Sequence, residues 1–159
     1  MPDLRLLALA AALALDLDGA VFCRLVGAES DWDVRAATAS SVGLAQINQA
    51  AWDWWPDDPF EPEANLRMGA WILKWNYVYR FDADTDTERW RQAVASYNLG
   101  HAAVNRLLAE YGDGWMDALG PEVRRYVENI VREGNDGGEC GKKSGQDDAI
   151  KQGTSRTAL

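Results

Sequence analysis

The amino-acid sequence predicts an all-α protein with one folded domain. Apolar side chains recur at helical spacing through most of the chain, and no segment shows convincing strand alternation. Helix-opening prolines at positions 62 and 121 and helix-closing glycines at 100, 112 and 134 divide the chain into helix-sized pieces. With 159 residues, 47% of them hydrophobic, the chain is long enough to bury a real core.

The first predicted helix covers residues 4–15, which are strong helix formers rich in Ala and Leu. Its apolar stretch also has about the length of a signal-peptide hydrophobic region, but Asp3 cancels the charge of Arg5 in front of it. The stretch is too short to span a bilayer, so no stable membrane insertion is expected. We favour a first helix packed on the core. On that interpretation the chain carries no export signal of its own, as in a phage lysis or virion protein.

The next elements are a helix and a loop. Asp16, Asp18 and Gly19 mark a break, and residues 19–28 continue as a helix that leads into Glu29. Residues 31–41 are typical of a loop, and the sequence does not decide whether a small hairpin forms near 38–47. A short helix is expected at 48–54, before a turn cluster at 56–59.

The helix that begins at Pro62 has the widest apolar stripe, which predicts a buried, central helix. The stripe consists of Leu66, Ala70, Trp71, Leu73, Trp75, Tyr77 and Val78. Thr85 and Glu88 fit a capping box, and Trp90 follows as a core position. Two more helices are expected at 101–111 and 121–132.

The composition changes after Gly134. Residues 1–134 form the predicted domain, and residues 135–159 are rich in polar residues and Gly, which predicts a disordered tail or a linker. Cys23 is expected to be a small buried hydrophobe and Cys140 lies in the tail, so no disulfide framework is predicted. With one His, His101, and no clustered Cys, no metal site is expected.

The charge balance excludes one class of partner. The chain has 16 Lys and Arg against 25 Asp and Glu, a formal net charge of −9. Nucleic-acid-binding domains usually carry a basic patch, so no nucleic-acid partner is expected.

The segment from Glu29 to Asn48 is the best candidate for chemistry. A carboxyl group at the end of an apolar helix is partly removed from water, which raises its pKa and suits a general acid. The run Gly43-Leu44-Ala45-Gln46-Ile47-Asn48 can bring the backbone and the amide side chains of Gln46 and Asn48 past that acid.

Four short motifs then occur in order. They are Glu29-Ser30, Gly43 to Asn48, Ser96-Tyr97-Asn98-Leu99-Gly100, and Glu122 with Tyr126-Val127. Over residues 15–132 this series resembles the catalytic domain of the soluble lytic transglycosylase family, within the lysozyme-like group that cleaves peptidoglycan. Its Gln-Ile-Asn ending looks like phage-type and secretion-associated members.

The resemblance implies a lysozyme-like fold and a reaction without cofactor. Glu29 would protonate the glycosidic oxygen and then act as base on the C6 hydroxyl of the same N-acetylmuramic acid, which gives a 1,6-anhydro product. The partner is a peptidoglycan glycan strand in the bacterial wall, reached in the periplasm, outside the cell, or by phage delivery. We expect a monomer.

The resemblance also assigns the other site residues. Gln46 would contact the N-acetyl region, Tyr97 would orient the acid, and Asn98 and Tyr126 would bind sugar. Ser30 would fix the carboxyl group, and Glu122 would support the site without contacting the substrate. Ala45, Ser96 and Val123 replace the Met, Ala and Thr of the family motifs. Trp32, Trp52 and Trp55 flank the motif loops and are candidate sugar platforms, whereas Trp71, Trp75 and Trp90 are expected in the core.

Two alternatives remain. A muramidase on the same fold would hydrolyse the bond and would usually need a second carboxylate. Asp31, Asp33, Asp53 and Asp57 are available for that role. A non-catalytic wall-binding virion component is the other alternative, against which the intact Glu29, Gln46 and Tyr97 argue.

Overall fold

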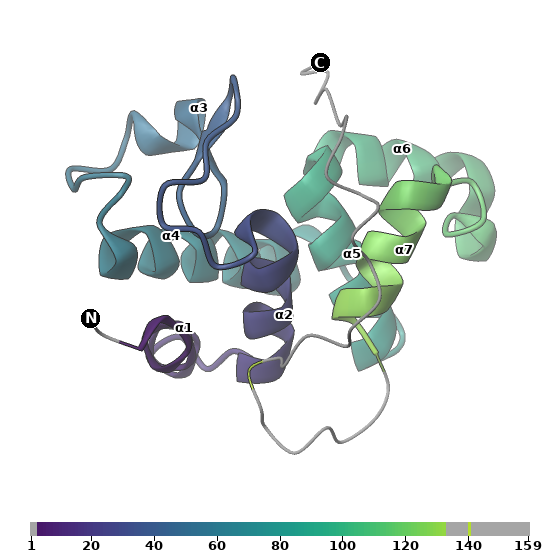
Figure 1. Ribbon diagram of the computed structural model, residues 1–159. Helices are drawn as coiled ribbons and strands as arrows, with labels where there is room; N and C mark the ends of the chain where they lie inside the picture. Colours follow the sequence, from purple (N-terminus) through teal and green to yellow (C-terminus); the bar gives the residue numbers. More distant parts are fainter. Residues whose placement is uncertain (1–2, 133–139, 141–159) are drawn as a thin grey trace.

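The computed structural model describes residues 3–132 and Cys140 (Figure 1). Within these residues it contains seven α-helices and a single two-stranded sheet, so the predicted all-α class is confirmed. The elements are α1 Leu4–Leu13, α2 Gly19–Ser30, β1 Ser41–Val42, β2 Ile47–Asn48, α3 Gln49–Trp52, α4 Pro62–Trp75, the π-helical η1 Asn76–Arg80, α5 Asp86–Leu99, α6 His101–Tyr111, the 3-10 segment η2 Gly112–Gly114 and α7 Pro121–Ile130. The strands pair antiparallel, with Val42 opposite Ile47, and form the small hairpin left open by the sequence.

Side-chain caps start the helices where the sequence predicts. Asp18 accepts hydrogen bonds from the backbone N–H groups of Ala20 and Val21 at 2.8 and 3.0 Å, which starts α2. Thr85 accepts from the N–H of Glu88 at 3.2 Å and starts α5. Gly100, with φ of 84°, separates α5 from α6. Because unpaired N–H groups at a helix start need acceptors, these caps fix where each helix begins.

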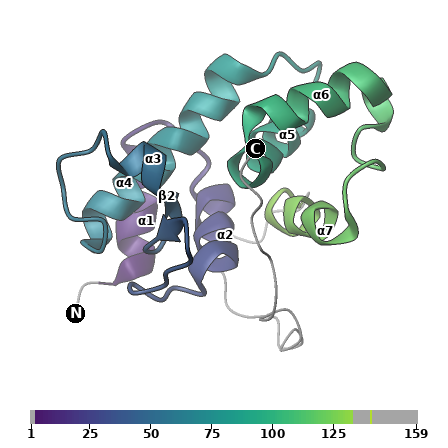
Figure 2. The ribbon, with the colours of Figure 1, turned by 90° about the horizontal axis from the view of Figure 1, so that it is seen from above.

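Two apolar clusters hold the fold together. The larger one joins α1, α2, α4, α5 and α7, and Phe22 and Leu25 of α2 lie fully buried in it. The smaller one lies under the hairpin, where Ile47 and Trp52 pack against Met68 of α4. Figures 1 and 2 show α2 between the hairpin on one side and α7 on the other. The last turn of α2 therefore lies between the hairpin and α7.

The helix interpretation of residues 4–15 is confirmed. In α1, Ala8 and Ala12 are fully buried against the core, and the helix packs on α2 and α4. None of the helices in the described part of the chain has the length and apolar character that a membrane span needs.

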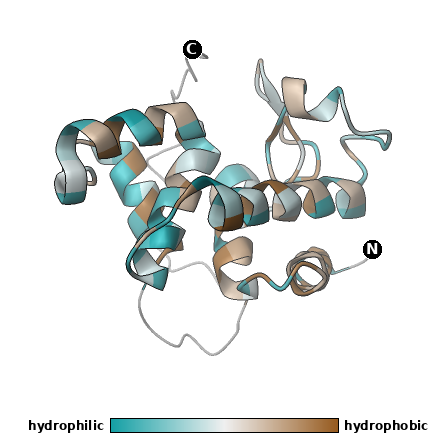
Figure 3. Ribbon diagram, turned by 180° about the vertical axis from the view of Figure 1, so that it is seen from behind, coloured by the Kyte–Doolittle hydropathy of each residue, from teal (hydrophilic) through white to brown (hydrophobic). Residues whose placement is uncertain are grey.

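The prediction that Trp71 and Trp75 belong to the core is wrong. Their exposed fractions are 46% and 39%, whereas Trp90 is buried as predicted. Trp71 lies about 200° around α4 from Gly69, which faces the interior, so its side chain points away from the core. The rings of Trp71 and Trp75 stack along this outer face with centroids 5.5 Å apart, and the ring of Tyr79 lies tilted against Trp75 at 4.5 Å. Figure 3 shows the molecule from behind, with α4 running across the middle of the view.

A disulfide bond corrects the interpretation of the cysteines. Cys23 of α2 is bonded to Cys140, with Cα atoms 5.2 Å apart, within the usual range. The two cysteines are 117 positions apart in the sequence, and no local pattern marks a pair so distant. The predicted tail at 135–159 lies outside the described residues except for Cys140, so it stays a prediction.

Candidate active site

Glu29 lies in the last turn of α2 and is half-buried. It follows Leu25 by four residues and Phe22 by seven, so its side chain shares the helix face of two fully buried residues. The carboxyl group therefore lies at the edge of the core, where α2 ends near the surface. This is the environment that the sequence predicts for a general acid.

Tyr126 of α7 contacts this carboxyl group directly. Its hydroxyl donates a hydrogen bond to Glu29 Oε1 at 2.6 Å. The position of α7 on α2 is fixed next to this contact, because Arg24 Nε donates to the carbonyl of Ile130 at 2.7 Å and Val127 is fully buried. The structure thus joins the first and last of the four sequence motifs.

Tyr97, predicted to orient the acid, donates its hydroxyl hydrogen bond to the carbonyl of Ala45 at 2.7 Å. It therefore holds the Gly43–Gln46 loop, and its role in orienting the acid stays a prediction. The hydroxyl of Tyr126 donates to Glu29. The signal for Tyr126 was present in the sequence as the spacing of Glu122 and Tyr126. What the sequence lacks is the packing of α7 on α2, which brings Tyr126 to the acid.

The turn after Glu29 has unusual backbone geometry. Asp31 and Trp32 have φ values of 51° and 66°, which are uncommon for residues with a side chain and especially so for a bulky one. Ser30 braces the turn: its hydroxyl donates to the carbonyl of Val26 at 3.2 Å and accepts from the N–H of Trp32 at 3.1 Å. This hydroxyl fixes the chain immediately after Glu29, and the predicted role of Ser30 in fixing the carboxyl group itself stays a prediction.

Trp32 folds back on the helices. A Cβ atom added to Gly27 of α2 would lie 3.3 Å from the indole Nε1, and the guanidinium carbon of Arg5 lies 5.4 Å from the ring centroid. One side of the indole is thus occupied by α1 and α2. The sugar-stacking role of Trp32 stays a prediction that concerns the remaining ring surface.

Gln46 has a φ of 48° and an exposed fraction of 5%. Its side-chain Nε2 donates to the carbonyls of Ala36 and Gly43 at 3.0 and 2.9 Å. The amide nitrogen thus closes the loop on which it lies. Contact between Gln46 and an N-acetyl group stays a prediction. The side-chain amide oxygen could make that contact, because the two bonds above use the amide nitrogen.

The remaining predicted residues lie in different settings. Asn48 is exposed and caps α3, accepting from the N–H of Ala50 at 2.9 Å. Trp52 is buried under the hairpin and has an exposed fraction of 8%. Asn98 is half-buried in the last turn of α5, and Glu122 is exposed in the first turn of α7, where a helix dipole favours a carboxylate. Their binding roles stay predictions.

Most of the candidate second carboxylates are engaged in local bonds. Asp57 accepts from Trp55 Nε1 and Arg67 Nη2, both at 3.0 Å. Asp53 accepts from Gln49 at 2.8 Å, and Asp33 from the N–H of Arg35 at 2.9 Å. Asp31 is the closest of the four to Glu29 in sequence and forms the left-handed C-cap of α2. Among the described residues, no group of three or more His, Cys, Asp or Glu side chains is placed to hold a metal ion.

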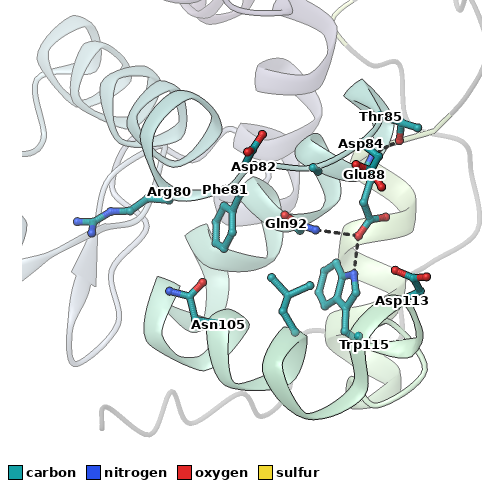
Figure 4. Close-up of a pocket in the computed structure, with 13 residues that line it drawn as sticks. Arg80, Phe81, Asp82, Asp84, Thr85, Glu88, Gln92, Asn105, Asp113 and Trp115 are labelled. Atoms are coloured by element: carbon teal, nitrogen blue, oxygen red, sulfur yellow. Dashed lines mark hydrogen bonds between the residues drawn. The ribbon is translucent and has the colours of Figure 1, made fainter.

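A polar pocket of about 620 Å³ lies elsewhere, at the N-terminal half of α5 (Figure 4). Asp82, Asp84 and Asp113 line it, and Glu88 Oε1 accepts from Trp115 Nε1 at 2.5 Å and from Gln92 at 3.1 Å. Glu88 precedes Tyr97 by nine positions, a rise of about 13 Å along α5. None of the predicted site residues lines this pocket, so we place the candidate active site at Glu29.

Comparisons with known proteins match the part of the chain that contains Glu29. The family model described as the transglycosylase SLT domain matches residues 7–116, which include Glu29, Gln46 and Tyr97 but not Tyr126. The chain is 28% identical over 146 residues to the membrane-bound lytic murein transglycosylase F of Pasteurella multocida (strain Pm70), covering 74% of this chain and 30% of that protein.

A solved structure shares the fold. The X-ray structure of an inactive glutamate-to-glutamine mutant of lytic transglycosylase Slt from Pseudomonas aeruginosa matches with a TM-score of 0.64 and 22% identity, over 79% of this chain and 22% of that one. The chain thus spans less than a third of the length of either protein.

Proposed function

The chain belongs to the transglycosylase SLT domain family, and on that premise we propose that it is a peptidoglycan lytic transglycosylase. It cleaves the β-1,4 bond between N-acetylmuramic acid and N-acetylglucosamine and leaves a 1,6-anhydromuramic acid end. The observation that carries this proposal is the half-buried carboxyl group of Glu29, which lies within the family match and accepts the hydroxyl hydrogen bond of Tyr126 at 2.6 Å.

In the proposed mechanism, Glu29 performs both proton transfers. Its carboxyl group donates a proton to the glycosidic oxygen as the bond from that oxygen to C1 of the muramic acid breaks. The resulting carboxylate accepts the proton of the C6 hydroxyl, and the C6 oxygen closes on C1. No water is consumed, and Glu29 ends in its starting protonation state. The N-acetyl group of the substrate stabilises the positive charge at C1 between the two steps.

Tyr126 has a defined part in this cycle. The carboxylate carries a full negative charge between the two proton transfers, and hydrogen bonds to charged groups are stronger than neutral ones. The hydroxyl of Tyr126 lies 2.6 Å from Glu29 Oε1, and this hydrogen bond holds the carboxyl group in place. We therefore assign Tyr126 as the residue that orients the acid.

One observation supports a mechanism with one carboxylate. Asp33, Asp53 and Asp57 each form local hydrogen bonds, as carboxylates with a structural role do. A hydrolytic muramidase would instead need a second carboxylate about 5–9.5 Å from the first.

The disulfide supports a site of action at the bacterial wall. Disulfide bonds persist in oxidising compartments such as the periplasm and the extracellular space, where peptidoglycan is accessible. The Cys23–Cys140 bond ties α2, the helix that bears Glu29, to the chain beyond α7. Delivery of the protein to the wall during phage lysis or from a virion fits the same requirement.

A Glu29→Gln variant tests the role of the acid. Gln has the same size, so we expect an unchanged thermal unfolding midpoint, retained sedimentation with purified peptidoglycan, and loss of muropeptide release by at least about 100-fold, as for other general acids. A Glu63→Gln variant, changed at an exposed carboxylate in the first turn of α4 that has no predicted role in the site, is the matched control. Unchanged release by Glu29→Gln would refute the proposal, and binding without release by the wild type would establish the wall-binding alternative.

A further inference from the structure

We propose that Asn65 of α4 is a positioning residue that holds the Gly43–Gln46 loop in register with Glu29. This inference rests on the proposed function and extends it to a residue outside the four sequence motifs. Asn65 has an exposed fraction of 1%, so its amide cannot act by touching the substrate. It acts through the loop that it binds.

Asn65 makes three hydrogen bonds to backbone groups of two loops. Its Oδ1 accepts from the N–H of Ala45 at 2.7 Å, and its Nδ2 donates to the carbonyls of Val42 and Pro59 at 3.1 and 2.9 Å. A buried amide that satisfies three backbone groups fixes its partners in both distance and direction. One side chain thus holds both the hairpin and the loop that leads into α4.

The peptide groups of Ala45 are clamped from two helices. Asn65 of α4 binds its N–H, and Tyr97 of α5 donates to its carbonyl at 2.7 Å. Ala45 is fully buried, so its N–H and its carbonyl cannot form hydrogen bonds with water instead. Asn65 and Tyr97 therefore set the position of Ala45 jointly, and Gln46 follows it directly.

Glycines let the loop come close enough for these bonds. A Cβ atom added to Gly43, which has a φ of 77°, would lie 2.1 Å from Asn65 Nδ2. A Cβ atom on Gly69, one helical turn after Asn65, would lie 2.4 Å from Ala45 Cβ and 3.6 Å from Phe22 of α2. Gly69 thus brings the loop and α2 together on one face of α4. Phe22 lies on the same face of α2 as Glu29, two turns earlier, so an error in the loop position changes the distance between Gln46 and the acid.

The test uses two substitutions and a matched control. Asn65→Asp keeps the acceptor for Ala45 but turns an oxygen toward the carbonyls of Val42 and Pro59, and Asn65→Leu keeps only the shape. Gln92→Leu removes another buried amide, which donates to Glu88 at the far end of α5. All proteins are compared at a temperature at which unfolding curves show them fully folded, with soluble uncross-linked glycan strands as substrate.

We expect a graded loss of activity that stability does not explain. A misplacement of about 1 Å near reacting groups can cost roughly 100-fold in rate. We therefore predict a fall in kcat/KM of about 10-fold for Asn65→Asp and about 100-fold for Asn65→Leu, with KM raised in both, and a change within about twofold for Gln92→Leu. If Asn65→Asp is folded and retains the kcat and KM of the wild type, the inference is wrong; should Asn65→Leu not fold, Asn65→Asp decides.

Hydrogen exchange separates this inference from the proposed function. The amide hydrogen of Ala45 should exchange at least about 10-fold faster in Asn65→Asp than in the wild type or Gln92→Leu, since local opening of the loop exposes it. If the wild type releases no 1,6-anhydro ends while this difference is found, the proposed function fails and the clamp on the loop stands. If exchange at Ala45 is unchanged, Asn65 does not position the loop.

Discussion

The hydroxyl of Tyr126 lies 2.6 Å from Glu29 Oε1, although 97 residues separate the two along the chain. The contact exists because α7 docks on α2 through Val127, Ile130 and the bond from Arg24 to the Ile130 carbonyl. The carboxyl group at the end of α2 is thus hydrogen-bonded by a side chain from α7, the last helix among the described residues.

Tyr126→Phe should lower activity without unfolding the domain. A hydrogen bond to a charged group contributes about 1.5–3 kcal/mol, so the rate of anhydro-muropeptide release should fall about 10- to 100-fold. The phenyl ring keeps the packing of α7, and the thermal midpoint should change little. Rates and unfolding curves of the variant and wild type check this, with Tyr79→Phe as a control for an exposed tyrosine. Full activity of Tyr126→Phe would remove Tyr126 from the mechanism.

The Cys23–Cys140 disulfide should contribute substantially to stability. Closing a loop of this length restricts the unfolded chain, and such bonds typically contribute about 2–5 kcal/mol. Urea unfolding should therefore show a lower midpoint after reduction with dithiothreitol. The Cys23→Ala/Cys140→Ala double variant should match the reduced protein and respond no further to the reductant. A wild-type midpoint that is the same with and without reductant would contradict the bond.

The exposure of Trp71 predicts a contrast with Trp90. Trp90→Ala should cost about 3–5 kcal/mol, as do other large-to-small changes in a core. Trp71→Ala should cost clearly less, because its ring already contacts solvent on the outer face of α4. Urea unfolding of the two variants gives this comparison. Equal losses would mean that the tryptophan stack on α4 is covered.

Stability should fall at alkaline pH through Tyr77. Burial, followed by the hydrogen bond and the charge of Asp86, raises the pKa of Tyr77 above its ordinary value of 10.0. A raised pKa in the folded state means that folding favours the neutral phenol. This stabilisation is fully present below pH 10 and is lost as the pH rises through the folded pKa. Urea midpoints from pH 9 upward should therefore decline less steeply in Tyr77→Phe, and identical slopes would show that Tyr77 does not contribute.

The sequence was most informative where the physics is local. Periodicity and caps such as Asp18 and Thr85 place helix boundaries correctly, because a helix start depends on neighbouring residues. The same local patterns could not show which side of α4 is covered. Trp71 and Trp75 fit an apolar stripe, yet no other element packs over them closely enough to bury them.

In the candidate site, too, the sequence predicts local features but not the contacts between distant segments. Glu29 was selected from its place at the end of an apolar helix together with the order of the four sequence motifs, and the family comparison supports the resemblance on which its role was assigned. The bonds from Tyr126 to Glu29, from Asn65 to Ala45 and from Cys23 to Cys140 join segments that only the tertiary fold brings together. Residue order alone could not assign these partners.

Mass spectrometry of the muropeptides that the wild-type protein releases from purified peptidoglycan tests the central claim most directly. A reaction in which Glu29 serves as acid and then base consumes no water. It should therefore release chains that end in 1,6-anhydromuramic acid, lighter by one water than hydrolysis products. Ordinary reducing ends would contradict the proposal and indicate a muramidase with a second carboxylate.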